Sequence, residues 1–275
     1  MKVSVYQINK LRKLTGIGIM DCKEALISSN GNIEEAIHLL RKKGEKIAIN
    51  RSTFQVKEGS VISTVNCNHT TGTIIGLTCE TDFLSKSQEF LNFLLMLSKK
   101  SLNFYNKKDF LDSFFHKNEK MKIKDLIIKE MGVSGEKIEL KFFERIDSPF
   151  VIDYTHNNYK IATIVGFSSD IDMHAARNIA MHITAMNPIS INKEEIPNSV
   201  IEKEIDVIKS QIKKEIKSDE MKQKIIEGKL QKFIINNTLL NQKFVRNNNI
   251  NVQEYLNKFD NNKHLKINLF KRIVI

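Results

Sequence analysis

Residue types that could support covalent chemistry are present in this sequence, but they do not form a catalytic pattern. The chain contains no GxxxxGKS or GxxxxGKT phosphate-binding loop, no GxSxG nucleophile elbow and no HExxH zinc motif. Its seven histidines are scattered, and a shared helix would place His174 and His182 about 12 Å apart, too far for one metal ion. The three cysteines form no CxxC pair. We therefore expect no enzyme and no bound metal, cofactor or nucleotide, and we interpret the histidines as packed or surface residues.

The segment Thr81-Asp82-Phe83-Leu84 has the residue types of a protein contact. A β-branched run predicts a buried strand at residues 74–79 and a helix is predicted at 87–103, so the segment should lie at the end of a sheet and face solvent. Asp82, near a helix N-terminus, could accept backbone N–H bonds and fix the turn. Phe83 would then be an anchor for a partner's pocket, a burial that contributes roughly 1.5–3 kcal/mol. The residues alone leave open that Phe83 instead packs under its own helix.

Residues 1–44 have the pattern of three short helices, separated by glycine turns. The first predicted helix carries a stripe of apolar residues at spacings of three: Val5, Ile8, Leu11 and Leu14. A polar linker is predicted over residues 45–57. Ile17, Ile19 and Met20 surround the first glycine turn, and they either form an apolar docking loop or fold back onto the small core.

Strand and helix patterns alternate over the rest of the chain. A hairpin followed by a helix occurs twice, at residues 60–103 and 150–187, which predicts a duplicated α+β unit with each sheet covered on one face by its helix. Two amphipathic stripes over about 194–233 predict an antiparallel helical hairpin that projects as an arm. A short helix at 252–259 and a strand at 265–275 complete the pattern.

We expect an α+β fold divided into three parts, because 275 residues exceed one typical domain of ~100–200 residues. The first part is a three-helix module at residues 1–50. The second is the N-terminal half of the α+β core at residues 57–140. The third is the C-terminal half of the core at residues 141–275, which carries the predicted arm.

The chain is basic, with 43 Lys and Arg against 32 Asp and Glu and a net charge of +11. RNA-binding proteins are often this basic, but the lysines are dispersed and no aromatic-rich RNA-binding strand is present, so RNA contact is not expected. The abundance of Asn, Ile and Lys suggests that part of the charge reflects an AT-rich genome. No stretch reaches the roughly 18 apolar residues of a membrane helix, and the N-terminus lacks a signal peptide's apolar segment. With few cysteines, these features predict a cytoplasmic protein without membrane contact.

Four stretches of the chain carry the motifs of one protein family. They are LRKLTGIGIMDCKEAL at residues 11–26, CETDFLSK at 79–86, MHITAMNP at 181–188 and EGKLQKF at 227–233. In these motifs, and in their order and spacing, the sequence resembles the family of bacterial translation elongation factor Ts, the guanine-nucleotide exchange factors of elongation factor Tu (EF-Tu). The second motif departs mildly from the family's usual pattern, in which Val and Ala follow the Phe.

The resemblance implies a mechanism. The N-terminal module would have a ubiquitin-associated-like (UBA-like) fold and would dock on the GTPase domain of GDP-bound EF-Tu through Leu11, Ile19 and Met20. Residues 81–84 would press on the partner's Mg²⁺ and phosphate site, so that GDP leaves and GTP can be loaded during polypeptide chain elongation. The region around Val252–Leu256 would reach another domain of the partner. Because some members of the family dimerise through the helical arm, homodimerisation stays an open alternative.

Overall fold

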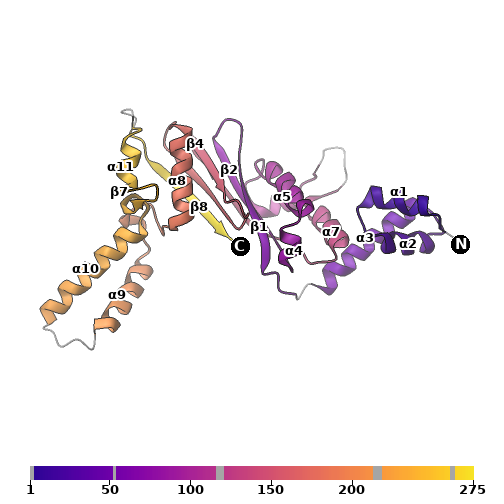
Figure 1. The fold of residues 1–275 in the computed structure, drawn as a ribbon, viewed down its shortest axis with the longest axis horizontal. Coiled ribbons are helices and arrows are strands. Elements are labelled where there is room, and N and C mark those ends of the chain that lie inside the picture. Colours follow the sequence, from indigo (N-terminus) through magenta and orange to yellow (C-terminus); the bar gives the residue numbers. More distant parts are fainter. Residues whose placement is uncertain (1–2, 52–53, 116–120, 213–218, 261–263) are drawn as a thin grey trace.

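Helices and sheets of the chain follow one another along an extended molecule in the computed structural model, which describes residues 3–51, 54–115, 121–212, 219–260 and 264–275. Figure 1 shows α1, α2 and α3 at the N-terminal end, the sheets in the middle, and the helices α9 and α10 at the other end. Two of the sheets have three strands each. This mixture of helices and sheets confirms the predicted α+β class. Among the described helices, none combines the length and the apolar character that a membrane span requires.

The N-terminal helices are α1 (Val5–Thr15), α2 (Ile19–Ser28) and α3 (Ile33–Asn50), as the sequence predicts in number and order. Asn32 caps α3, since its side-chain oxygen accepts the backbone N–H groups of Glu34 and Glu35 at 3.0 and 3.2 Å. Gly16 ends α1 with a φ of 75°, a conformation that glycine adopts without steric cost. The three helices enclose a small core of their own: Ile8, Leu11, Ile17, Cys22, Ala25, Leu26, Ala36 and Leu40.

Helix α3 is longer than the sequence predicts, because it continues through residues 45–50, which we expected to be linker. Its second half packs against α7 (Ile123–Ser134), where Gly44 faces Gly132. A Cβ atom on Gly44 would lie 3.0 Å from the carbonyl oxygen of Ile128, so a side chain at this position would strain the crossing. The extension of α3 therefore depends on a tertiary contact that local periodicity does not reveal.

The first sheet contains β1 (Glu58–Val65), β2 (Thr71–Cys79) and β3 (Glu139–Asp147), all antiparallel, in the order β1-β2-β3. One face is covered by α5 (Gln88–Ser101), with α6 (Lys107–Asp112) and α7 beside it. The core between this face and the helices includes Ile75, Leu77, Phe90, Phe93, Leu94, Leu97, Phe110, Ile123, Ile127 and Leu140.

The second sheet contains β4 (Phe150–Thr155), β5 (Ile161–Phe167) and β8 (Ile267–Val274), also antiparallel, and is covered by α8 (Met173–Met186). The predicted repetition of a hairpin and a covering helix is thus confirmed, with a third strand added to each sheet. The uncovered faces of the two sheets pack together through Val61, Ile74, Ile146, Val151, Ala162 and Ile164. Because both faces of the sheets are covered, β2 and β5 are buried at almost every position rather than at alternate ones, and their sequences are correspondingly rich in apolar residues.

The C-terminal part begins with α9 (Asn198–Ile212) and α10 (Asp219–Asn237), which extend away from the sheets in Figure 1. They pack against each other through Ile208, Ile212 and Ile226. The turn expected between them falls at residues 213–218, outside the described residues. The chain continues through β6 (Lys243–Phe244), β7 (Asn247–Asn251) and α11 (Val252–Asn257) before β8.

A buried histidine joins α8 to the segment that follows α10. His182 is 0% exposed; its Nε2–H donates to Oε1 of Gln242 at 3.0 Å, and its Nδ1 accepts the backbone N–H of Val245 at 3.1 Å. The Gln242 amide donates in turn to the carbonyl oxygens of Met186 and Asn236. Both nitrogens of the neutral ring therefore have partners, and burial lowers the pKa of His182. The interpretation of this residue as a packed histidine is confirmed.

Acidification is expected to destabilise the fold through His182. Its pKa in the folded state lies below the ordinary value of 6.5, so the unfolded chain binds more protons than the folded chain as the pH falls through 6.5 towards the lowered pKa. The contribution of this residue is complete above pH 6.5 and is lost as the pH falls towards the lowered pKa. In urea unfolding followed by circular dichroism at a series of pH values, the free energy of unfolding should fall less steeply with decreasing pH for His182→Gln than for the wild type. The exposed His174→Gln should keep the wild-type slope, and identical slopes for all three proteins would contradict the assignment.

Candidate functional site

The segment Thr81–Leu84 forms a turn at the end of β2 and enters the single-turn helix α4 (Asp82–Ser85). Figure 1 shows α4 beside β1, between the first sheet and the N-terminal helices. Thr81 has extended backbone angles, and its Oγ1 accepts the backbone N–H of Leu84 at 3.2 Å. We expected the side chain of Asp82 to fix this turn, but the side chain that caps it is that of Thr81.

Asp82 forms an exposed ion pair within the turn. The Nζ of Lys86 donates to its Oδ2 at 2.7 Å, one helical turn further along the chain. This hydrogen bond and the positive charge of Lys86 hold the pKa of Asp82 below its ordinary value. The Asp82 side chain is 63% exposed, so a negative charge is presented to solvent directly beside Phe83.

Phe83 points away from the protein and is 85% exposed. The alternative in which its ring packs under its own helix is therefore excluded. The inward positions of α4 are occupied by Leu84, which is half-buried against the core of the first sheet, and by Ser85, which is fully buried. Most of the apolar surface of the Phe83 ring is available for burial in a partner.

Two polar contacts beneath α4 fix it to the sheet. Ser60 on β1 donates from its Oγ to the carbonyl oxygen of Ser85 at 2.9 Å. The thiol of Cys79, at the end of β2, donates to the carbonyl oxygen of Thr81 at 3.2 Å. Burial raises the pKa of Cys79 to about 12, so the thiol stays protonated and keeps this donor. The short helix therefore has a defined position although it contains a single turn.

Three charged residues lie at the base of the turn: Arg51, Glu80 and Glu136. Glu136 accepts the backbone N–H groups of Glu80 and Thr81, and the Nη1 of Arg51 donates to Glu80 at 2.5 Å. Partial burial raises the pKa of Glu80, but hydrogen bonds from Arg51 and from the N–H of Lys137 outweigh it and leave the pKa lowered. Glu80 stands within the CETDFLSK motif, whereas Glu136 is 55 residues from Thr81 and has no signal in the sequence.

The three residues implied to dock the N-terminal module lie in different environments. Ile19 and Met20, on the first turn of α2, are 48% and 64% exposed. Leu11 is 0% exposed within the core of the three helices, so the implied direct contact through Leu11 is corrected. Leu11 lies on the inward face of α1 and fills part of this core. Ile17 also folds inward, and the expected docking loop is thus reduced to Ile19 and Met20.

The C-terminal contact region implied at Val252–Leu256 also needs correction. Val252 and Leu256 are 0% and 1% exposed, because they pack into the core of the second sheet beneath α8. These two apolar residues hold α11 in place and cannot contact another molecule directly. A contact through this region would have to use the outer face of α11.

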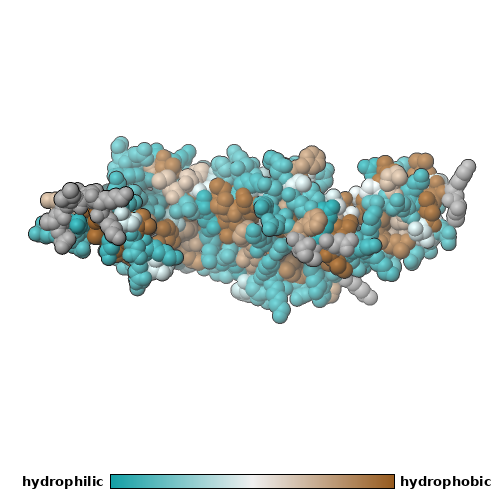
Figure 2. Space-filling model, turned by 90° about the horizontal axis from the view of Figure 1, so that it is seen from below, coloured by the Kyte–Doolittle hydropathy of each residue, from teal (hydrophilic) through white to brown (hydrophobic). Residues whose placement is uncertain are grey.

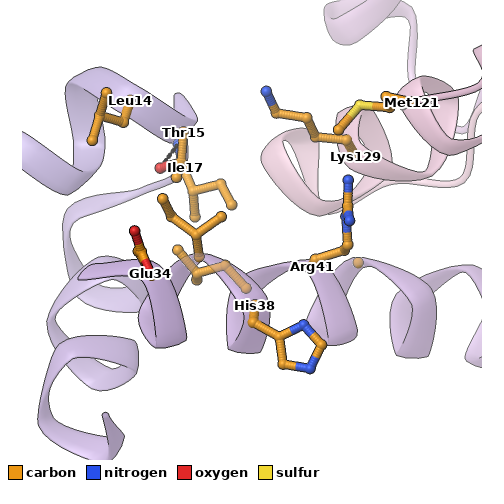
Figure 3. A pocket seen from close by; sticks show the side chains of 11 residues that line it. Leu14, Thr15, Ile17, Glu34, His38, Arg41, Met121 and Lys129 are labelled. Carbon is orange, nitrogen blue, oxygen red and sulfur yellow. Dashed lines mark hydrogen bonds between the residues drawn. The ribbon is translucent and has the colours of Figure 1, made fainter. Parts of the chain in front are cut away.

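A groove of about 340 Å³ lies between the N-terminal helices and α7 (Figure 3). Figure 3 shows Arg41 reaching it from α3 and Lys129 from α7, while Leu14 and Ile17 supply apolar walls. Neither Phe83 nor the Ile19–Met20 pair lines it. The groove is therefore separate from the exposed residues described above.

The described surface offers exposed apolar side chains for binding a partner. Figure 2 shows hydrophobic residues in separate patches on a mostly hydrophilic surface. Within the part of the chain that the structure describes, no group of three or more His, Cys, Asp or Glu side chains could hold a metal ion. These features define an α+β protein with exposed apolar side chains at two places, Phe83 on the turn that Thr81 caps and Ile19 and Met20 at the start of α2.

Comparison with known proteins gives the family. The family model described as Elongation factor TS matches residues 80–275. The chain is 41% identical to Elongation factor Ts of Flavobacterium psychrophilum over 275 residues, which cover 99% of this chain and 98% of that relative. It is 38% and 35% identical to the proteins of the same name from Christiangramia forsetii and Porphyromonas gingivalis, covering 100% of this chain and 99% of each relative. The chain therefore belongs to the elongation factor Ts family, translation elongation factors of protein biosynthesis.

Proposed function

We propose that this chain binds GDP-bound elongation factor Tu and accelerates the release of GDP, so that GTP can be loaded during polypeptide chain elongation. Family membership supports the choice of partner. The observation that carries the proposal is the position of Phe83, which is 85% exposed on a turn that Thr81 caps and that contacts beneath α4 hold. An apolar ring held in this way can enter a pocket of another protein without first being ordered.

In the proposed complex, the Phe83 ring inserts beside the partner's Mg²⁺ and phosphate site, with the Asp82 carboxylate next to it. Insertion loosens the partner's contacts to the metal and the phosphates, and GDP leaves. The exchange factor and GDP then weaken each other's binding by the same factor. Each tenfold increase in GDP release requires about 1.4 kcal/mol of differential stabilisation. This chain forms no covalent bond in the cycle, so we propose neither an enzymatic activity nor a cofactor of its own.

The N-terminal helices would provide a second contact. We assign residues 1–50 as a UBA-like module that docks on the GTPase domain through Ile19 and Met20, with Leu11 supporting that surface from inside the module. Residues 57–140 and 141–275 would be the two halves of the core. Two separated contacts on one chain strengthen binding, because the second forms at high effective concentration once the first has formed.

The helices α9 and α10 are proposed to be the arm of the molecule. They expose Val207 and Met221, at 48% and 52%, which would give a second copy of the chain an apolar surface to pack on. Homodimerisation through this pair is compatible with exchange activity, because Phe83 lies on the other half of the core. RNA contact and a location outside the cytoplasm are not part of the proposal.

Addition of this chain at micromolar concentration is expected to speed dissociation of a fluorescent GDP analogue from elongation factor Tu by about tenfold or more, which requires about 1.4 kcal/mol. Stopped-flow fluorescence with excess unlabelled GDP measures the rate directly. A GTPase of another family should release its nucleotide at an unchanged rate and serves as the control. An unchanged rate for elongation factor Tu itself would overturn the proposed function.

A further inference from the structure

The base of the Phe83 turn contains a carboxylate with three hydrogen-bond donors directed at it. Glu136 lies in the loop between α7 and β3. Its Oε2 accepts the backbone N–H of Glu80 at 3.1 Å and that of Thr81 at 3.0 Å. Its Oε1 accepts the hydroxyl of Thr81 at 2.6 Å. Hydrogen bonds to an ionised acceptor are roughly twice as strong as those between neutral groups, so Glu136 restrains two successive residues of the chain.

A second carboxylate, that of Glu80, accepts a backbone N–H from the segment that contains Glu136. The Oε1 of Glu80 accepts the backbone N–H of Lys137 at 2.6 Å, while its Oε2 accepts from Arg51. Residues 80–81 and 136–137 therefore exchange backbone-to-carboxylate bonds in both directions. We call these four residues the carboxylate clasp. It joins the end of β2 to the start of β3 at the position where the chain leaves the sheet towards α4.

The clasp acts on Phe83 through the cap of α4. Because the Thr81 hydroxyl donates its hydrogen to Glu136, its oxygen keeps lone pairs for the backbone N–H of Leu84 at 3.2 Å. Glu136 thus selects the side-chain orientation of Thr81 that caps the helix. Asp82 is paired with Lys86 and takes no part in the clasp. The exposed Phe83 ring makes few contacts with its own chain. The direction in which it points therefore depends on the backbone that the clasp holds.

We propose that Glu136 is a positioning residue for nucleotide exchange, which fixes the Thr81–Asp82 backbone so that Phe83 is presented in one direction. The inference rests on the proposed function and adds a residue to it that lies outside the CETDFLSK motif. A loosened turn would still allow the two proteins to meet through their broader surface. It would reduce the fraction of complexes in which the ring reaches the geometry that releases GDP.

The test compares Glu136→Ala, Glu136→Gln and the matched control Glu139→Ala, whose side chain is exposed on β3. For Glu136→Ala we expect the maximal rate of GDP release to fall about tenfold and the half-saturating concentration to change less than about threefold, as lost charge-assisted hydrogen bonds predict. Glu136→Gln should recover most of the rate, because its amide oxygen still accepts both backbone N–H groups and its NH₂ can donate to Thr81. Glu139→Ala should match the wild type.

Hydrogen exchange of the 81–84 amides provides a readout that does not need elongation factor Tu. We expect faster exchange in Glu136→Ala, with unchanged protection in α5 and an unchanged circular dichroism spectrum. If Glu136→Ala does not fold, Thr81→Val removes the hydroxyl contact while keeping the side-chain shape, and the same rate loss is expected. A wild-type chain without exchange activity would refute the proposed function alone. A Glu136→Ala variant with wild-type rate and wild-type amide protection, or equal losses of rate and affinity without rescue by Gln, would refute the positioning role.

Discussion

Replacing Phe83 with alanine is expected to slow the maximal rate of GDP release about 30- to 100-fold, which corresponds to about 2–2.7 kcal/mol. The estimate follows from the exposure of the ring, since 85% of its surface is free to be buried. Burying a Phe side chain contributes roughly 1.5–3 kcal/mol, and truncation of an aromatic anchor at the centre of an interface commonly costs about 2 kcal/mol or more.

The rate should fall more than the affinity. A group that contacts the partner mainly in the state with a disturbed Mg²⁺ site stabilises that state and not the initial complex. Affinity for GDP-bound elongation factor Tu, measured by calorimetry, should therefore weaken less than about tenfold, because Ile19, Met20 and the remaining surface are unchanged. Stability should change little, since the ring makes few contacts within its own chain.

Tyr105→Ala is the matched control for the loss of an exposed aromatic ring. Tyr105 is 78% exposed and stacks on Arg145, with 4.4 Å between the guanidinium and the ring centroid. It lies beyond α5, away from α4 along the chain, so its removal should leave both rate and affinity unaltered. Equal losses of rate and affinity in Phe83→Ala would show that the ring is a general contact and does not act on the metal site.

Much of the fold could be predicted because its elements are long and strongly patterned. The β-branched runs that became β2 and β5 and the apolar stripe of α5 require burial on defined faces, and their boundaries match the structure within a few residues. The second half of α3 was missed for the opposite reason. Its polar and basic residues have no clear period, and packing of Gly44 against Gly132 holds them in a helix.

The environment of the candidate site residues could not be predicted from the local sequence. An exposed anchor and a hydrophobic staple have the same local sequence, and the environment of Phe83 is decided by Leu84 and Ser85, which occupy the inward side of α4. For Leu11, the helical stripe correctly predicted burial, whereas the role taken from the family resemblance placed it at the surface. The two middle residues of the stripe, Ile8 and Leu11, are buried. The two end residues, Val5 and Leu14, are 72% and 56% exposed.

The carboxylate clasp could not have been found from one sequence. Glu136 and Thr81 are separated by 55 residues, and no period or motif connects them. They meet because β3 pairs with β2 and begins where β2 ends, with Thr78 opposite Glu139. A contact of this kind depends on strand register, which is specified by the packing of both sheet faces and not by the residues that form the contact.

Gly44→Leu is expected to weaken binding of elongation factor Tu about 10- to 100-fold, because it separates the two proposed contacts from their fixed relative position. A Cβ atom at Gly44 already lies 3.0 Å from a backbone oxygen of α7 and 3.5 Å from the Cα of Gly132, so a full leucine side chain cannot fit. Overpacking of this kind costs typically about 1–3 kcal/mol, and the chain can relieve it by moving α3 away from α7.

The small core of the N-terminal helices should survive this substitution. Its α3 residues, Ala36 and Leu40, precede Gly44, and its other buried residues lie on α1, on α2 and in the turn between them, while α7 adds the half-buried Val133. Calorimetry would then report the lost affinity, while circular dichroism would show unchanged helix content. Gly228→Leu on α10 is the matched control, because no atom lies within 4 Å of a Cβ placed there. The double variant Ile19→Ala and Met20→Ala should lose affinity to a similar degree without moving α3. If Gly44→Leu instead binds like the wild type, the α3–α7 crossing does not set the position of the module, and the two contacts act on the partner independently.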